Sequence, residues 1–188
     1  MKYAIVTNPA SGNMNLKRRR KKLEDAARIL GAPIFGFETG TKEEFIELVK
    51  EVSSDYDVLV VGGGDGTFSD VINSIDLSSS ILAFLPLGSG NALKNALGLR
   101  GTVIDITQEI RNADVHSYDL IECSARKFGF MVSIGIEGVV VRLREKYLEA
   151  GVKGLQSYLI PTLDAYIRDY KRVSARMLLI EENSPWTI

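Results

Sequence analysis

The residues best suited to chemistry in this chain are four glycines around a single aspartate. The apolar, strand-like run 58–61 leads directly into Gly62-Gly63-Gly64-Asp65-Gly66-Thr67. Glycine lets the backbone turn sharply and approach a ligand without a Cβ in the way. Backbone N–H groups left free at such a turn, with a helix starting behind them, suit a phosphate. The aspartate would repel a phosphate unless Mg²⁺ lay between them, so the segment predicts a nucleotide with its metal. The alternative is a tight turn whose aspartate caps the helix.

Two further loops have a related composition, and each also follows a predicted strand. They are Asn8-Pro9-Ala10-Ser11-Gly12 and Leu85-Pro86-Leu87-Gly88-Ser89-Gly90-Asn91-Ala92. Either loop alone could be an ordinary turn with proline and glycine residues. Because all three loops fall at the same edge of one predicted sheet, we expect them to form one ligand site.

The elements that position these loops alternate between strand-like and helix-like patterns. Strands are predicted at 3–7, 33–37, 58–61 and 81–85, and helices at 16–30, 41–52, 68–75 and 91–97. Four successive βα units imply a parallel sheet with helices on both faces. Such sheets bind ligands at the carboxyl ends of their strands, which is where the glycine loops lie.

The pattern changes after about residue 101. Here we predict a strand at 102–106 and a short helix at 108–113, followed by hairpin strands at 117–123 and 128–134 that are joined by a turn at 124–127. A helical region is predicted from about 140 to 170, with breaks near Gly151, Gly154 and Pro161. A last strand is predicted at 173–180. The expected fold class is therefore α/β. Residues 1–113 form a nucleotide-binding domain, and residues 114–188 form the start of an incomplete antiparallel β-rich domain with a helical insertion.

Composition narrows the classes of function. The 188 residues carry a formal net charge of -1, which gives no reason to expect nucleic acid as a partner. The single cysteine, Cys123, cannot form an internal disulfide, and no apolar stretch is long enough to span a bilayer. We expect a cytoplasmic protein whose membrane contact, if any, is peripheral. The basic run 17–22 could attract anionic lipid headgroups, although a solvated helix face is the favoured interpretation.

Taken together, the three loops resemble the diacylglycerol kinase catalytic-domain family. That family includes bacterial diacylglycerol and multi-substrate lipid kinases, and also sphingosine and ceramide kinases. The segment Ser133-Ile134-Gly135-Ile136-Glu137 resembles the point at which the lipid-binding β-domain of these kinases begins. The aspartate loop alone is shared with NAD kinases and phosphofructokinases, whereas the combination of loops in this order is specific.

The resemblance implies an ATP- and Mg²⁺-dependent kinase that phosphorylates a hydroxyl of diacylglycerol or of a sphingoid-type lipid presented at a membrane surface. It places the nucleotide in a cleft between two domains and makes Asp65 the residue that organises the metal. The residues that it assigns to the nucleotide are Asn8, Ser11, Gly12, Thr39, Gly63, Gly64, Asp65, Gly66, Thr67, Gly88, Ser89, Gly90 and Asn91.

The chain also departs from the family pattern. Ala92 stands where diacylglycerol kinases usually have an aspartate, although the sphingosine-kinase branch tolerates alanine there. In the family, the general base and most metal ligands come near the end of a longer β-domain, so no catalytic base is assigned here. Two alternatives stay open: an enzyme like NAD kinase, and a non-catalytic nucleotide- or lipid-binding module. The exposed sheet edges of an incomplete β-domain further predict self-association.

Overall fold

The structure is a computed structural model that describes residues 1–9, 15–88, 90–123, 127–133, 135–152, 154, 156–172 and 174. The chain divides into two compact units, residues 1–130 and residues 131–188. The first unit contains the glycine loops. The sequence predicts a domain boundary after residue 113, whereas the chain divides into its two compact units after residue 130. The predicted domain boundary stays a prediction.

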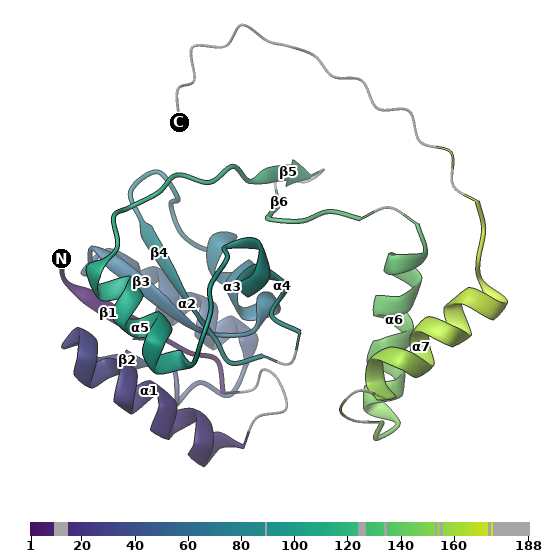
Figure 1. Cartoon of the computed structure of the whole chain (residues 1–188), viewed down its shortest axis with the longest axis horizontal. Helices are drawn as coiled ribbons and strands as arrows, with labels where there is room; N and C mark the ends of the chain where they lie inside the picture. The colour runs from purple at the N-terminus through teal and green to yellow at the C-terminus, as the bar shows by residue number, and fades with distance from the viewer. Residues whose placement is uncertain are drawn as a thin grey trace, which may run out of the picture. The chain divides into compact units, whose positions relative to one another are not determined.

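The first unit is built on a parallel sheet of four strands (Figure 1). The strands are β1 (Tyr3–Val6), β2 (Ile34–Phe35), β3 (Val58–Gly63) and β4 (Ile81–Pro86). Their order across the sheet is β2-β1-β3-β4, and every neighbouring pair is parallel. The predicted fold class, an α/β protein with helices on both faces of a parallel sheet, is confirmed.

Among the described residues of this unit, five helices surround the sheet: α1 (Leu16–Leu30), α2 (Lys42–Ser53), α3 (Asp65–Ile72), α4 (Ala92–Ala96) and α5 (Val103–Asn112). Local capping explains where two of them begin. The side chain of Asn15 accepts a hydrogen bond from the backbone N–H of Lys17 at 2.9 Å, and that of Thr41 accepts one from Glu44 at 3.2 Å. These bonds satisfy N–H groups that have no partner within their helix.

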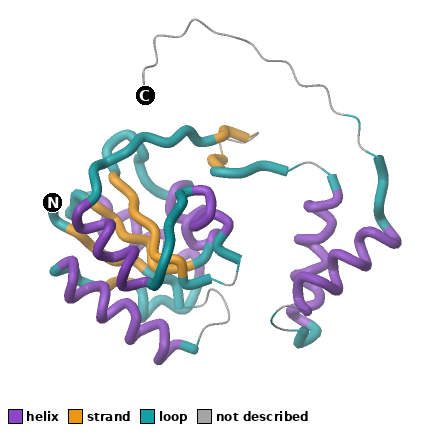
Figure 2. The backbone as a smooth tube through the Cα atoms, viewed as in Figure 1, coloured by secondary structure: helices purple, strands orange, loops and turns teal. Residues whose placement is uncertain are grey.

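The core lies in two layers because strand side chains alternate between the faces of the sheet. On one face, Val61 packs in a cluster with Phe45 of α2 and with buried residues of α3 and α4. On the other face, Val60 packs in a cluster with Leu23 of α1 and Ile106 of α5. The helices therefore cover both faces of the sheet (Figure 2).

The strand predicted at 102–106 is wrong, because these residues begin α5. Thr102 and Asp105 form a capping box: the Thr102 side chain accepts from the Asp105 N–H at 3.3 Å, and the Asp105 carboxylate accepts from the Thr102 N–H at 2.7 Å. Val103, Ile106 and Thr107 are buried, which is the spacing of one face of a helix. The β-branched residues favoured a strand, but the cap and this spacing decide the outcome.

A short antiparallel hairpin completes the first unit. Its strands, β5 (Ile121–Cys123) and β6 (Lys127–Gly129), are shorter than the two predicted at 117–123 and 128–134. Residues 124–126 of the predicted turn lie outside the described residues. The side chain of Asn73, which follows α3, accepts from the N–H of Phe128 at 2.8 Å and donates to its carbonyl at 2.9 Å. The hairpin is therefore fixed to the end of α3.

The second unit is a pair of packed helices, α6 (Ile136–Glu149) and α7 (Gln156–Arg168). Gly151 and Gly154, with φ of 88° and 66°, lie between the two helices, as predicted. The predicted break at Pro161 is wrong, because this proline is buried inside α7. The Tyr147 hydroxyl donates to the Asp164 carboxylate at 3.1 Å and links the pair.

The strand predicted at 173–180 lies outside the described residues, except for Ser174, which is not in a strand. Within the described part of the chain, none of the helices combines the length and the apolar character needed to cross a membrane.

Candidate functional site

The glycine loops after β3 and β4 lie directly against each other. A Cβ on Gly88 would lie 2.7 Å from the Cα of Gly64, so neither position has space for a side chain on that side. The backbone N–H of Leu87 donates to the carbonyl of Gly63 at 2.7 Å. The two loops predicted to bind phosphate thus form one continuous backbone surface at the carboxyl end of the sheet.

Asp65 joins these two loops. One of its carboxylate oxygens accepts a hydrogen bond from the N–H of Ala92 and the other from the N–H of Leu93, both at 3.0 Å. These are the first two N–H groups of α4, which have no partner within their own helix. The negative charge also lies where the dipole of α4 is positive.

A second set of bonds shapes the loop after β4. Asn91 has a left-handed backbone, with φ of 51°. Its side-chain oxygen accepts from the N–H of Gly88 at 3.1 Å, and its amide nitrogen donates to the carbonyl of Gly88 at 2.7 Å. Gly90 is exposed beside them. Ser89, also predicted to bind the nucleotide, lies outside the described residues.

The start of α3 is open on its outer side. Its N-cap is Gly64, which has no side chain to bond the first N–H groups of the helix. Gly66 is exposed, and a Cβ built there would meet no atom within 4 Å. Thr67, by contrast, is buried, and its side chain lies beneath Gly63. The exposed part of this loop is therefore backbone rather than side chain.

The loop after β1 is held by a hydrogen bond from a buried side chain of α1. Asn8 is buried, and its carbonyl accepts a hydrogen bond from the guanidinium of Arg19 at 2.5 Å. Burial lowers the pKa of Arg19 below its usual value. Arg19 is therefore buried, whereas the basic run 17–22 to which it belongs was expected to form a solvated helix face. Ser11 and Gly12, the other predicted residues of this loop, lie outside the described residues.

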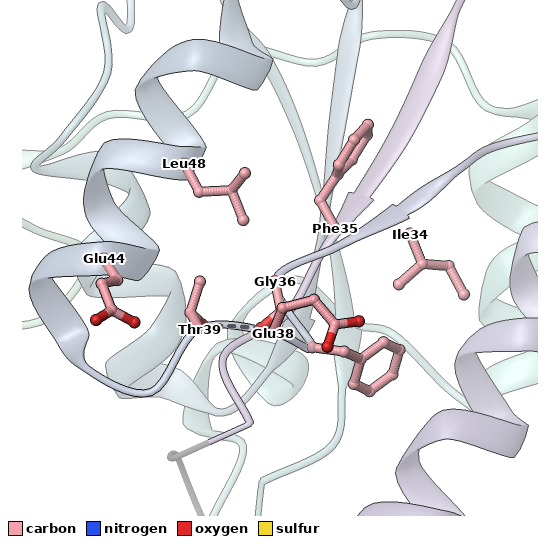
Figure 3. A pocket seen from close by; sticks show the side chains of 8 residues that line it. Ile34, Phe35, Gly36, Glu38, Thr39, Glu44 and Leu48 are labelled. Atoms are coloured by element: carbon pink, nitrogen blue, oxygen red, sulfur yellow. Dashed lines mark hydrogen bonds between the residues drawn. The ribbon is translucent and has the colours of Figure 1, made fainter.

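A cavity of about 380 Å³ lies at the carboxyl end of β2 (Figure 3). Thr39 is one of the residues that line it, and its hydroxyl donates to the carbonyl of Gly36 at 2.8 Å. Gly36 has φ of 100° and leaves no room for a Cβ against the Thr7 carbonyl, so β2 and β1 end in close contact. The lining residues are Ile34, Phe35, Gly36, Phe37, Glu38, Thr39, Glu44 and Leu48.

Thr39 was predicted as a site residue only through the family resemblance, and the other residues that line the cavity were not predicted. The strand predicted at 33–37 concealed a signal, since β2 ends at Phe35 and Gly36 follows it just as the other loop glycines follow their strands. The N–H groups of Ala92 and Leu93 were also missed, because a backbone donor has no signature in the sequence.

The described residues contain no cluster of the side chains that usually bind metal ions. Among them there is no group of three or more histidine, cysteine, aspartate or glutamate side chains that could hold an ion. Both oxygens of Asp65 accept backbone hydrogen bonds, and Asp70 forms an ion pair with Lys42 at 2.6 Å. Mg²⁺ binding by Asp65 therefore stays a prediction.

Comparison with known proteins gives consistent matches. Residues 2–123 match the sequence model described as the diacylglycerol kinase catalytic domain. A protein named "Putative lipid kinase" from Streptococcus pneumoniae serotype 4 is 27% identical over 179 residues, which are 89% of this chain and 58% of that protein. A diacylglycerol kinase of Staphylococcus saprophyticus is 29% identical over 136 residues, 66% of this chain and 42% of that enzyme. The chain thus spans about half the length of these relatives.

The fold has a similar match among solved structures. A crystal structure titled as a putative diacylglycerol kinase from Bacillus anthracis str. Sterne superimposes with a TM-score of 0.54 and 24% identity. The match covers 63% of this chain and 40% of that one. At this level of identity the likeness concerns the fold alone.

Proposed function

The chain belongs to the diacylglycerol kinase catalytic-domain family, and from this premise we propose that it binds ATP with Mg²⁺ and phosphorylates a hydroxyl of a lipid. Diacylglycerol or a sphingoid-type lipid, presented at a membrane surface, is the proposed acceptor. The main supporting observation is the contact between the loops after β3 and β4, which offers backbone rather than side chains to a ligand.

The phosphates are proposed to lie at the start of α3. Helix N-termini attract anions through their N–H groups and dipole, and this helix has no side-chain cap. Gly66 exposes the first turn to the solvent and puts no side chain in the way. A phosphate chain could therefore approach the backbone closely.

The nucleoside is proposed to occupy the cavity beside Thr39. Neighbouring strands lie about 4.8 Å apart, and β1 separates β3 from β2, so the cavity lies about 10 Å along the sheet edge from the glycine loops. An extended nucleoside triphosphate spans such a distance. Apolar side chains such as Leu48 suit a base, and the exposed carboxylate of Glu38 suits ribose hydroxyls.

In this proposal the chain contributes binding and orientation. Phosphoryl transfer depends mainly on holding the reacting groups in line and stabilising charge on the phosphate oxygens. Mg²⁺ bound with ATP would supply positive charge at those oxygens. The residues of the first unit hold the phosphate chain through backbone N–H groups. Transfer by this chain, which spans about half of its relatives, is itself part of the proposal.

The variant Gly66→Ala tests the proposed phosphate site. We expect the dissociation constant for ATP, measured by calorimetry, to rise at least tenfold, because the new methyl group lies in the path of the phosphates. Stability should be unchanged or rise by up to about 1 kcal/mol, since alanine favours a helix more than glycine does. Gly138→Ala is the matched control, because Gly138 also lies in the first turn of a helix with open space around it. Wild-type affinity in Gly66→Ala would contradict the site.

The proposed reaction requires a separate measurement. The 188-residue chain should transfer labelled phosphate from ATP to diacylglycerol or sphingosine in mixed vesicles, and should form no NADP⁺ from NAD⁺. ATP binding without transfer to either lipid would contradict the kinase proposal and leave a nucleotide-binding module.

A further inference from the structure

We propose that Asp65 is a positioning residue that clamps the two glycine loops together and does so without a metal ion. The inference rests on the proposed function insofar as those loops bind a nucleotide. It replaces the expected role of Asp65, that of a magnesium ligand, with a role inside the protein scaffold.

The geometry of the carboxylate supports a clamp. Its two oxygens bond to two consecutive N–H groups, those of Ala92 and Leu93, each at 3.0 Å. The bonds join positions 27 and 28 residues apart in the sequence and cross from the first turn of α3 to the first turn of α4. Only a charged carboxylate, which offers two acceptors and no donor, can make this pair of bonds.

Helix α4 depends on such support. It has five residues, too few for a helix to be stable on its own in water. Among the described residues of α4, Leu93 is buried and packs in the core of the first unit. The cap from Asp65 therefore fixes the start of α4, and with it the spacing between Gly64 and Gly88.

The clamp also determines where an anion can bind. The first two N–H groups of α4 already have a carboxylate as their partner. A triphosphate is therefore directed to the open start of α3, at Gly66, rather than to α4. The charge of Asp65 is partly offset by the positive end of α4, which reduces its repulsion of the phosphates.

The two roles of Asp65 make opposite predictions for the metal-free protein. If Asp65 is a metal ligand, its replacement changes nothing in the presence of EDTA. If Asp65 is a clamp, Asp65→Asn disturbs the metal-free protein as well, because the new amide group presents an N–H to a backbone N–H. We expect the melting temperature in EDTA to fall by about 2–4 °C, the size expected for a lost helix cap in a chain of this length.

The matched control is Asp105→Asn, which replaces another carboxylate that caps a helix, at the start of α5. Both variants should lower the melting temperature, but only Asp65→Asn should weaken the binding of ATP measured in EDTA, by about tenfold. A second measurement needs no variant: in the wild-type chain with EDTA, hydrogen exchange at the N–H groups of Ala92 and Leu93 should be slow.

Each outcome decides the proposal. Fast exchange at both N–H groups of the wild-type chain would overturn the clamp. So would an Asp65→Asn variant that melts like the wild type in EDTA and loses only the effect of added Mg²⁺. Equal loss of ATP affinity in both variants would reduce Asp65 to a general stabilising residue and overturn its positioning role. If the wild-type chain binds no ATP, the proposed function fails, while melting and exchange still test the clamp.

Discussion

The two units of this chain differ in how completely they bury their apolar side chains. Residues 1–130 contain a core on each face of a sheet, and strand residues such as Val60 and Val61 are fully buried. In residues 131–188, α6 has no buried residue, and Leu163 and Ile167 of α7 are 61% and 79% exposed. The candidate site thus lies on the unit with its own core, and the matched family region, residues 2–123, lies within this unit.

The largest expected effect comes from removing the same side chain in each unit. Leu59 of β3 is 1% exposed, so Leu59→Ala should lower the free energy of unfolding by about 2–5 kcal/mol. Leu163→Ala, at an exposed position, should change it by less than about 0.5 kcal/mol. Denaturant unfolding of the two variants provides the measurement. Equal losses would show that α7 is as well packed as the sheet and would remove the difference between the units.

A smaller effect is expected within the second unit. The hydrogen bond to Asp164 raises the pKa of the Tyr147 hydroxyl. A raised pKa means that this contribution to stability is complete below about pH 10 and is lost as the pH rises through the higher folded value. Asp164→Asn should therefore lower the pKa of Tyr147 toward its usual value in a spectroscopic titration. An unchanged tyrosine titration would show that α6 and α7 are not joined by this bond.

The smallest effect belongs to the cap of α5 in the first unit. Hydrogen bonds from Thr102 lower the pKa of Asp105. Its contribution to stability is therefore complete above about pH 4 and is lost as the pH falls through the lower folded value. Comparing thermal unfolding of the wild type and Asp105→Asn between pH 7 and pH 3 should show the difference shrinking in acid, because this variant removes the carboxylate that accepts both bonds from Thr102. A difference independent of pH would contradict the capping box.

The sequence predicted the first unit well because its signals are local. Helix α1 begins and ends where predicted, since Asn15 caps one end and Gly31, with φ of 64°, ends the other. The strand predicted at 102–106 was wrong because that prediction did not take into account the cap that Thr102 and Asp105 form at the start of α5.

The sequence was enough to predict which loops form the candidate site, but not which hydrogen bonds hold these loops together. The rule that ligands bind at the carboxyl ends of parallel strands was enough to place Gly64 and Gly88 at one edge. It could not reveal that Asp65 bonds to the backbone of α4, because a long-range bond to a backbone N–H depends on packing rather than on residue type. Gly36 and its cavity were missed for another reason, because Gly36 was placed inside the strand predicted at 33–37 and β2 ends at Phe35.

The bonds between Asn73 and Phe128 also have a consequence for association between chains. A strand at the edge of a sheet offers unpaired N–H and C=O groups, onto which another polypeptide can add a strand. Asn73 occupies both groups of Phe128 with a single side-chain amide and so takes the place of a neighbouring strand. At this point β6 cannot serve as a template for a second copy, and the self-association expected from open sheet edges, which stays a prediction, would have to use another edge.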